Sequence, residues 1–510
     1  MIIVIDFGSQ LAHLIAKKIR KLGEYSEIID PGVSPQKVIE LNPSGIILSG
    51  GPVSVYAEGS PTINKEILSL GIPILGICYG YQLIAYLKEG KVEKGEKAEY
   101  GVTKMQILKN HPLFEGLEQE EEVLMSHTDR VLKPPNEGIF IAKTENATAA
   151  YADDVNKLYG IQFHAEVEHT PKGMKIFDNF LKICNSSRQW SSEIFIEQQL
   201  KELKKIDGPV LMAVSGGVDS TVAAQLIEKA VPEKLHCIFV DNGLLRLNEA
   251  ENVNEGYKKM FKNFHFVDAK EIFFNRLKGI TDPEKKRKII GNTFIEVFEK
   301  KSKELEEKFG KFLYLGQGTI YPDRVESAAT SKQAKVIKTH HNVGGLPEKM
   351  ALKLVEPLKD LYKYEVREVG KEIGLDETFI NRHPFPGPGL AVRCLGEVTQ
   401  EAIRNIQLAD DIVRSRLKMD KRVKYYDLWQ VFFVLLPTVH SVGVMGDART
   451  YENPGIIRVV KSTDAMTAIV PELPFDLLLS IANEIVNNVS GINRVCLDLT
   501  GKPPGTIEWE

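Results

Sequence analysis

One cysteine lies where a strand is expected to turn sharply into a helix. The run GIPILGICYGYQLIAYLK places Cys78 between a buried strand that ends near Ile77 and a helix that begins near Tyr79, and Gly76 and Gly80 leave room for the turn. The free N–H groups and the dipole of a helix N-terminus favour the thiolate, the reactive form of a cysteine. We therefore expect Cys78 to be a nucleophile, although a small buried core residue is the commoner role for cysteine.

A histidine and a carboxylate end a later strand at a spacing that lets them meet. In LYGIQFHAEVEHT, His164 and Glu166 are two residues apart and project from the same face of an extended chain. His164 is expected to take the thiol proton, and Glu166 to fix its tautomer and stabilise the imidazolium. The tight glycine turn of LSGGP suits the Gly51 N–H to the developing oxyanion, which the Tyr79 N–H would also face.

A glycine-rich loop after another strand is suited to holding an anion. In VLMAVSGGVDSTVAAQL the glycines let backbone N–H groups approach closely, and the helix that follows adds its dipole. The loop lacks the G-K-[ST] ending of a Walker A motif and has no lysine placed to bridge the last two phosphates, so it suits pyrophosphate as a leaving group. A turn without catalytic use is the alternative. The residues in or beside this loop are Ser215, Gly216, Gly217, Val218, Asp219, Ser220 and Thr221.

Short apolar strands alternate with amphipathic helices on either side of a polar segment, which favours α/β units. The Pro- and Gly-rich run HPFPGPGLAVR then forbids regular structure and marks a boundary. We expect two doubly wound, mainly parallel-sheet domains and a smaller C-terminal α+β domain. The predicted bounds are 1–185, a linker at 186–192, 193–385, and 386–510.

Composition narrows the class of protein. With 65 Lys and Arg against 69 Asp and Glu, the formal charge of −4 argues against a bulk basic surface for nucleic acid. Five cysteines without a CxxC pair argue against a disulfide scaffold or a zinc ribbon and for a reducing compartment. No apolar stretch approaches the roughly 20 residues that span a bilayer. A cytoplasmic enzyme without nucleic-acid or membrane partners is expected.

The first 185 residues resemble the triad (class I) glutamine amidotransferases, through Cys78, His164, Glu166 and the GGP turn in that order. The resemblance implies that Cys78 attacks the glutamine side-chain amide, releases ammonia and leaves a glutamyl thioester for water to cleave. The family usually reads F-H-P-E where this chain has Ala165, so a proline that stiffens the loop is missing. A segment like MSHTDRV contacts the glutamine backbone or a neighbouring domain in that family, which here points to Ser126, His127 and Asp129.

SGGVDS resembles the signature of N-type ATP pyrophosphatases, which cleave ATP between its first and second phosphates. FVDNGLLR, at 239–246, follows the next strand where such proteins hold adenine and ribose, so Asp241 is expected at ATP. Mg²⁺ is expected with ATP as a bridge between phosphates, because hard oxygen ligands suit it.

Four further segments resemble the GMP synthetase family: GQGTIYPDRVES, IKTHHNVGGLP, RHPFPGPGLAVR and the terminal KPPGTIEWE. The resemblance implies ATP-driven, glutamine-dependent amination of xanthosine 5′-monophosphate (XMP) at C2 through adenylated XMP, giving GMP, AMP, pyrophosphate and glutamate. It also implies a homodimer through the C-terminal domain. IKTHHNVGGLP would be a lid that places Lys338, His340 and His341 near the phosphates of ATP. The residues expected to bind XMP are Arg246, Asp323, Lys502 and Glu508.

Three other functions share some of these features. Glutamine-dependent NAD synthetases have a similar phosphate loop but a nitrilase-type glutaminase without this cysteine turn and FHxE pair. tRNA-thiolating enzymes usually need paired redox cysteines and a basic surface, and this sequence has neither. A catalytically dead metabolite-binding regulator would not require both the intact triad and the intact phosphate loop.

Overall fold

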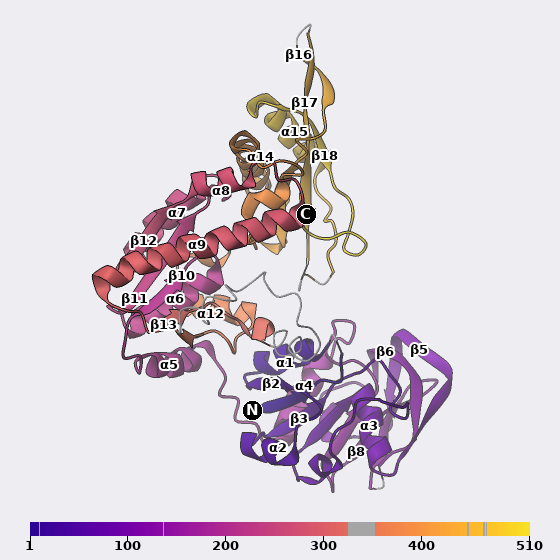
Figure 1. The fold of residues 1–510 in the computed structure, drawn as a ribbon. Helices are drawn as coiled ribbons and strands as arrows, with labels where there is room; N and C mark the ends of the chain where they lie inside the picture. Colours follow the sequence, from indigo (N-terminus) through magenta and orange to yellow (C-terminus); the bar gives the residue numbers. More distant parts are fainter. Residues whose placement is uncertain (10, 136, 325–351, 446–447, 463–464, 466) are drawn as a thin grey trace. The chain divides into compact units, whose positions relative to one another are not determined.

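The chain forms two compact units, Met1–Phe195 and Ile196–Glu510, in a computed structural model (Figure 1). The structure describes residues 1–510 except 10, 136, 325–351, 446–447, 463–464 and 466. No helix among these residues is long and apolar enough to cross a membrane.

In the first unit, nine strands of the described chain form one sheet in the order β2-β1-β3-β4-β9-β8-β7-β5-β6. The strands β2, β1, β3, β4 and β9 are parallel, whereas every pair from β9 to β6 is antiparallel. The expectation of a mainly parallel sheet is therefore corrected to a mixed one. Its strands are β1 (Ile2–Ile5), β2 (Ser26–Ile29), β3 (Gly45–Leu48), β4 (Ile74–Ile77), β5 (Lys91–Ile107), β6 (Glu120–Lys133), β7 (Ile139–Lys143), β8 (Thr148–Asp153) and β9 (Leu158–Ile161).

The parallel half of this sheet is buried because helices cover both of its faces. All residues of β1, β3, β4 and β9 are buried, as uninterrupted apolar strands between two layers require. Tyr79, Tyr81 and Leu83 pack with Ile3 and Ile5 in one apolar core. The helices of the unit are α1 (Ala12–Lys21), α2 (Pro35–Leu41), α3 (Tyr79–Leu87) and α4 (Gly173–Ile183).

The second unit contains a parallel sheet of five described strands in the order β12-β11-β10-β13-β14. Helix α5 (Ser192–Leu203) begins at the last residue of the predicted linker and ends before the first strand of this sheet. The strands are β10 (Val210–Ala213), β11 (Leu235–Asp241), β12 (Asn263–Asp268), β13 (Tyr314–Gly316) and β14 (Lys353–Val355). The accompanying helices are α6 (Val218–Ala230), α7 (Glu249–Met260), α8 (Lys270–Leu277), α9 (Pro283–Phe309), α12 (Lys363–Glu372) and α13 (Glu377–Ile380).

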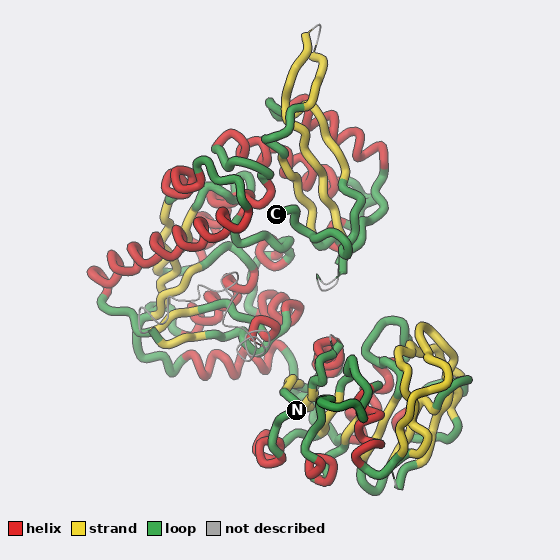
Figure 2. Tube along the Cα trace, turned by 45° about the vertical axis from the view of Figure 1, so that its right-hand side comes forward, coloured by secondary structure: helices red, strands yellow, loops and turns green. Residues whose placement is uncertain are grey.

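A smaller sheet with two helices completes this unit. Strand β17 pairs antiparallel with β15 and β16 and parallel with β18, and β16 and β17 project as a two-stranded hairpin (Figures 1 and 2). The 3-10 helix η3 (Gly389–Arg393) connects the two sheets. The remaining elements are α14 (Gln400–Met419), β15 (Gln430–Leu435), β16 (Ser441–Met445), β17 (Ala448–Val460), α15 (Phe475–Asn488) and β18 (Ile492–Leu497).

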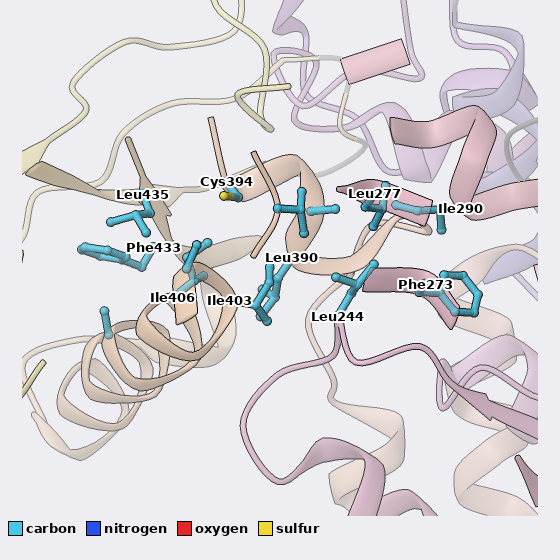
Figure 3. Close-up of a cluster of buried hydrophobic side chains, with 14 of the residues drawn as sticks. Leu244, Phe273, Leu277, Ile290, Leu390, Cys394, Ile403, Ile406, Phe433 and Leu435 are labelled. Atoms are coloured by element: carbon cyan, nitrogen blue, oxygen red, sulfur yellow. The ribbon is translucent and has the colours of Figure 1, made fainter. Parts of the chain in front are cut away.

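One hydrophobic core runs through both sheets of the second unit. Leu244 and Phe273 beside the parallel sheet join Leu390 of η3 and Phe433 of β15 in the same cluster of buried side chains (Figure 3). The positions of residues 196–385 and 386–510 relative to each other are therefore fixed by shared packing within the second unit. The structure is an α/β protein with a mixed sheet, a parallel sheet and a small C-terminal sheet backed by helices.

Candidate active sites

The predicted nucleophile lies at a strained turn. Cys78 connects β4 to α3 with φ +51° and ψ −101°, a conformation that a residue with a side chain rarely adopts. The turn leaves no room for larger residues on either side of it. A Cβ on Gly76 would lie 2.4 Å from the Gly80 carbonyl, and a Cβ on Gly80 would lie 2.4 Å from the Leu48 carbonyl oxygen. The sequence prediction of a sharp elbow is confirmed.

Cys78, His164 and Glu166 form one chain of contacts. The His164 Nδ1 lies 2.7 Å from the Glu166 Oε1, and Cys78 lies close enough to His164 to affect its pKa. Burial alone would lower the pKa of His164, but the hydrogen bonds and negative charges of Cys78 and Glu166 raise it to about 10. The imidazole therefore holds a proton strongly when the thiol has given one up. The Cys78 thiol lies 3.7 Å from the Ser126 carbonyl oxygen.

The GGP turn packs directly against the elbow. A Cβ on Gly51 would lie 3.0 Å from the Tyr79 ring, and a Cβ on Gly50 would lie 3.3 Å from the His164 ring and 3.9 Å from the Cys78 Cβ. The backbone can approach the nucleophile this closely only because both residues are glycines. Among the described residues, neither the Gly51 nor the Tyr79 amide donates a hydrogen bond, so both are suited to an oxyanion.

The loop after His164 is held without the proline that the family usually has. Thr170 donates a hydrogen bond of 2.6 Å to the His164 carbonyl and accepts one of 3.1 Å from the Leu124 amide. Helix α4 also packs on this loop, since a Cβ on Gly173 would lie 1.9 Å from the Ala165 carbonyl oxygen. Hydrogen bonds and packing thus fix the loop that carries His164 and Glu166.

The segment MSHTDRV contributes to this site mainly through its backbone. His127 is buried, with its Nε2 3.1 Å from Glu99 and its Nδ1 2.9 Å from the Asp129 carbonyl. The Asp129 carboxylate accepts a hydrogen bond of 3.0 Å from the Tyr56 hydroxyl. The side chains of His127 and Asp129 are therefore engaged inside the unit, while the Ser126 carbonyl faces the nucleophile.

The phosphate loop has the geometry of an anion cradle. Gly216 has φ +77°, and Gly217 is the N-cap of α6 with no side chain capping the helix. The hydroxyls of Ser215 and Ser220 lie 3.3 Å apart and close the loop. Thr221 is fully buried, and its hydroxyl bonds to the Gly217 carbonyl at 2.8 Å and to the Tyr257 hydroxyl at 2.6 Å. Thr221 thus supports the loop from beneath.

Two cations reach this loop from distant parts of the chain. Lys363, the first residue of α12, forms an ion pair with Asp219. Arg382 donates a hydrogen bond to the Gly216 carbonyl and pairs with Glu249. Burial and the charges of Arg246 and Arg414 lower the pKa of Arg382 to about 9. The sequence interpretation found no lysine within the loop and assigned no role to these two residues, although Arg382 begins the motif RHPFPGPGLAVR.

Of the other residues predicted at ATP, the structure describes Asp241 but not the three residues of the lid. Asp241 is buried at the end of β11, where it accepts the Gly243 amide at 2.9 Å and lies 3.0 Å from the Lys270 ammonium. Lys338, His340 and His341 lie outside the described residues. The described part of the chain contains no group of three or more His, Cys, Asp or Glu side chains that could hold a metal ion.

Two of the predicted XMP ligands meet in a cluster of buried charges. Arg393 makes bidentate hydrogen bonds of 2.8 and 3.1 Å to Glu508. Asp410 lies 3.9 Å from both Arg393 and Arg246, and 3.4 Å from Arg414. Burial, above all, and the neighbouring Arg414 lower the pKa of Arg246 to about 9. Sequence reasoning missed Arg393, Asp410 and Arg414, although Arg393 ends the HPFPGPGLAVR motif.

Several nitrogen atoms in this cluster have no hydrogen-bond partner among the described residues. They are the Arg246 Nε, the Arg393 Nη1, the Arg414 Nε and both ring nitrogens of His383. Phe385 lies under the Arg246 guanidinium at 4.6 Å. The three guanidinium nitrogens still lie 3.4 to 3.9 Å from the Asp410 carboxylate. Arg246, Arg393 and Arg414 share the carboxylates of Asp410 and Glu508, and the positive charge that remains suits an anionic ligand.

The other two predicted XMP ligands are engaged locally. Lys502 donates a hydrogen bond of 2.8 Å to the Ala465 carbonyl. Asp323 accepts one of 3.2 Å from the Ile320 amide. The structure thus connects Arg246 to Glu508 through Asp410 and Arg393. These hydrogen bonds of Lys502 and Asp323 are made to other residues, outside this cluster.

Comparisons with known proteins cover the whole chain. The profile of the family Glutamine amidotransferase class-I matches residues 3–184, and that of the GMP synthase C terminal domain matches residues 417–509. A glutamine-hydrolysing GMP synthase of Aquifex aeolicus is 49% identical over 513 residues, which span 100% of this chain and 99% of that protein. The corresponding protein of Carboxydothermus hydrogenoformans is 51% identical over 514 residues, with the same coverage of both chains.

Proposed function

The chain belongs to the glutamine-hydrolysing GMP synthases, and we propose that its two units each carry one half of that family's reaction. It is a ligase that aminates XMP to GMP with glutamine as the nitrogen donor. The residues that carry each half, and the order of the steps, are assigned below from the geometry of the two sites.

The proposed domains follow this division of labour. Residues 1–185 form a doubly wound glutaminase domain with an antiparallel extension, and 186–192 form the linker. Residues 193–385 form a doubly wound adenylating domain. Residues 386–510 form a domain for dimerisation and XMP binding, packed on the adenylating domain by their common core.

In the first unit, Cys78 attacks the amide carbon of the glutamine side chain while His164 holds the thiol proton. The N–H groups of Gly51 and Tyr79 stabilise the negative oxygen of the tetrahedral intermediate. His164 gives its proton to the leaving nitrogen, and ammonia departs as the C–N bond breaks. Water then attacks the thioester with His164 as the base, and glutamate leaves. Glu166 keeps the imidazole in the required tautomer throughout.

In the second unit, the C2 oxygen of XMP attacks the first phosphorus of ATP, and pyrophosphate leaves. Ammonia then adds at C2, and the C–O bond to AMP breaks. The phosphate loop at 215–221 holds the phosphates through its amides and the dipole of α6. Lys363 and Arg382 supply the positive charge that the loop itself lacks. Asp241 orients the turn beside the adenosine through its bond to Gly243.

Mg²⁺ is proposed to enter with ATP. The Asp219 Oδ1 is buried and has no hydrogen-bond partner among the described residues, which suits a single carboxylate facing a magnesium ion held mostly by phosphate oxygens. The ion would neutralise charge on the phosphates. Lys338, His340 and His341 are proposed to contact the same phosphates from the lid.

The guanidinium cluster is the proposed site for XMP. Arg246, Arg393 and Arg414 share the carboxylates of Asp410 and Glu508, and their remaining positive charge suits the 5′-phosphate, for which charge-assisted bonds are the strongest available. Glu508, Lys502 and Asp323 are assigned to the rest of the nucleotide.

The C-terminal hairpin supports the proposal of a homodimer. Val442 and Tyr451 are opposite each other on β16 and β17 and are 53% and 62% exposed, and Val444 on the same strand face is 74% exposed. A projecting strand pair with an exposed apolar face is typical of an interface. The cytoplasm, where nucleotides and glutamine are supplied, is the proposed location.

The observation that carries the proposal is the separation of the two constellations. The Cys78–His164–Glu166 chain lies wholly within the first unit, and the phosphate loop with the guanidinium cluster lies wholly within the second. Incubation of the purified protein with MgATP, XMP and glutamine should give GMP, AMP, pyrophosphate and glutamate in equal amounts. With ammonium in place of glutamine, the first three should still form. Formation of ADP and phosphate instead would contradict the assigned cleavage of ATP.

A further inference from the structure

One lysine of the long helix α9 is completely buried. The Lys286 side chain has no exposed surface, whereas Lys301 on the same helix is partly exposed and pairs with Glu304 at 3.0 Å. An ammonium group is costly to bury unless charges and hydrogen bonds compensate it. The packing of α9 requires no charge here, because Ile290, one turn later, lies in the hydrophobic core (Figure 3).

The Lys286 ammonium is fully compensated by acceptors from two distant segments. It donates to the Glu510 carboxylate at 2.6 Å and to the carbonyl oxygens of Cys394 at 2.6 Å and Ala391 at 3.3 Å. These three acceptors match the three donors of an ammonium group. Lys286 therefore joins α9 to η3 and to the end of the sequence at the same point.

The residues that Lys286 holds flank an ion pair of the proposed XMP site. Ala391 and Cys394 lie on either side of Arg393, and Glu510 is two residues beyond Glu508. Arg393 and Glu508 are themselves joined by two hydrogen bonds. Lys286 thus anchors the backbone of one partner and the chain segment of the other.

The preceding part of this segment is held by a different side chain. Arg458 of β17 is fully buried and donates to the carbonyl oxygens of Thr500, Thr506 and Ile507. Those bonds end before Glu508. Arg458 and Lys286 therefore hold the segment on the two sides of Glu508. Lys286 also contacts the backbone beside Arg393 directly, whereas Arg458 lies opposite Phe432, whose ring packs under the Arg393 guanidinium at 4.1 Å.

We propose that Lys286 is a positioning residue for XMP: through Glu510 and the two carbonyls it fixes the distance between Arg393 and Glu508. The inference rests on the proposed function, which assigns Glu508 and this cluster to XMP. Lys286 touches no substrate in this account. Its loss should weaken XMP binding while the phosphate loop, built from other segments, keeps its affinity for ATP.

The test compares dissociation constants for XMP and MgATP, measured by calorimetry on the full chain. Lys286→Met should raise the constant for XMP roughly tenfold and leave that for MgATP unchanged, because the lost bonds involve a charged group. Glu510→Gln, which keeps one acceptor, should raise the XMP constant about threefold. In the Lys286→Met background, Glu510→Gln should add nothing, since both act through the same contact.

Two reference variants make the result decisive. Lys301→Met, the same substitution at the partly exposed pair of the same helix, should match the wild type. Wild-type XMP affinity in folded Lys286→Met or Glu510→Gln would overturn the inference, and so would an equal loss of XMP and MgATP affinity, the sign of general loosening. If Lys286→Met fails to fold, Glu510→Gln decides. Should Glu508→Gln leave XMP binding intact, the XMP assignment itself fails, and the inference with it.

Discussion

The two sites differ in how their polar groups are partnered. In the first unit, the thiol, the imidazole and the carboxylate contact one another, and the His164–Glu166 bond is 2.7 Å long. In the second unit, Arg246, Arg393, Arg414 and His383 have buried nitrogen atoms without hydrogen-bond partners among the described residues, and the three arginines share the Asp410 carboxylate at 3.4 to 3.9 Å. The groups of the first site partner one another, whereas the second site has three guanidinium groups that share two carboxylates and keep a surplus of positive charge.

This difference follows from the chemistry assigned to each site. Glutamine hydrolysis uses protein side chains as nucleophile and base, so these groups must be poised against each other before the substrate arrives. In the amination of XMP, the atoms that react belong to ATP, XMP and ammonia. In the proposed account, the protein there binds and orients charged substrates with fixed charges and donors.

The largest effect within the second site is expected from Asp219. Asp219→Asn removes the carboxylate paired with Lys363 at the phosphate loop. GMP formation should fall roughly 10³-fold with glutamine and with ammonium alike, because positioning of the ATP phosphates is shared by both reactions. Steady-state rates with each nitrogen source measure this. Asp207→Asn, at an exposed carboxylate of the same unit, should have no effect. If Asp219→Asn slowed GMP formation with glutamine but not with ammonium, the assignment of Asp219 to the ATP site would be contradicted.

A smaller effect, confined to the first site, is expected from Glu166. Glu166 is one of the groups that raise the pKa of His164 to about 10, so Glu166→Gln should lower that pKa and the imidazolium should be lost at a lower pH. Glutaminase activity at neutral pH should fall roughly 10²-fold, and the alkaline limb of its pH profile should move down. The exposed Glu168→Gln provides the matched control. An unshifted alkaline limb would show that the carboxylate does not act through His164.

The smallest effect concerns a histidine pair whose pH response is opposite to that of His164. His265 stacks on His236 with their ring nitrogens 3.2 Å apart, and burial, followed by the charge of His236, lowers the pKa of His265 to about 4. Between about pH 6.5 and about pH 4, His265 is protonated in the unfolded chain but neutral in the folded chain. The folded state therefore loses stability as the pH falls from about 6.5 to about 4.

His265→Phe should therefore reduce the drop in melting temperature between pH 7.5 and pH 5 by a few degrees. Thermal unfolding at the two pH values measures it, with the exposed His440→Phe as the control. An equal drop in the wild type and His265→Phe would mean that this pair does not contribute to acid sensitivity.

The sequence was sufficient where a site is built from neighbouring residues. The Cys78 turn depends on Gly76 and Gly80, and the histidine and carboxylate are two residues apart, so local geometry alone indicated the elbow and the pair. The cradle of the phosphate loop was predicted for the same reason. Each of these features needs only one strand, one turn and one helix.

The sequence was insufficient where a contact joins distant segments. Lys363 and Arg382 lie 144 and 166 residues from the loop atoms they bind, and no local pattern distinguishes them from surface cations. The antiparallel strands β5 and β6 were also missed, because their polar residues resemble exposed loops in sequence. Thr221 was assigned to ATP from its place in the motif, but its hydroxyl is buried against Tyr257.

The most direct test of the central claim, that each unit carries one half of the reaction, is GMP synthesis by Cys78→Ala with two nitrogen sources. Glutamine-dependent synthesis should fall by roughly 10⁴-fold or more, because the nucleophile is lost. Ammonium-dependent synthesis should stay near the wild-type rate, because the second unit retains every group assigned to it. Loss of both activities in the folded variant would contradict the division of labour.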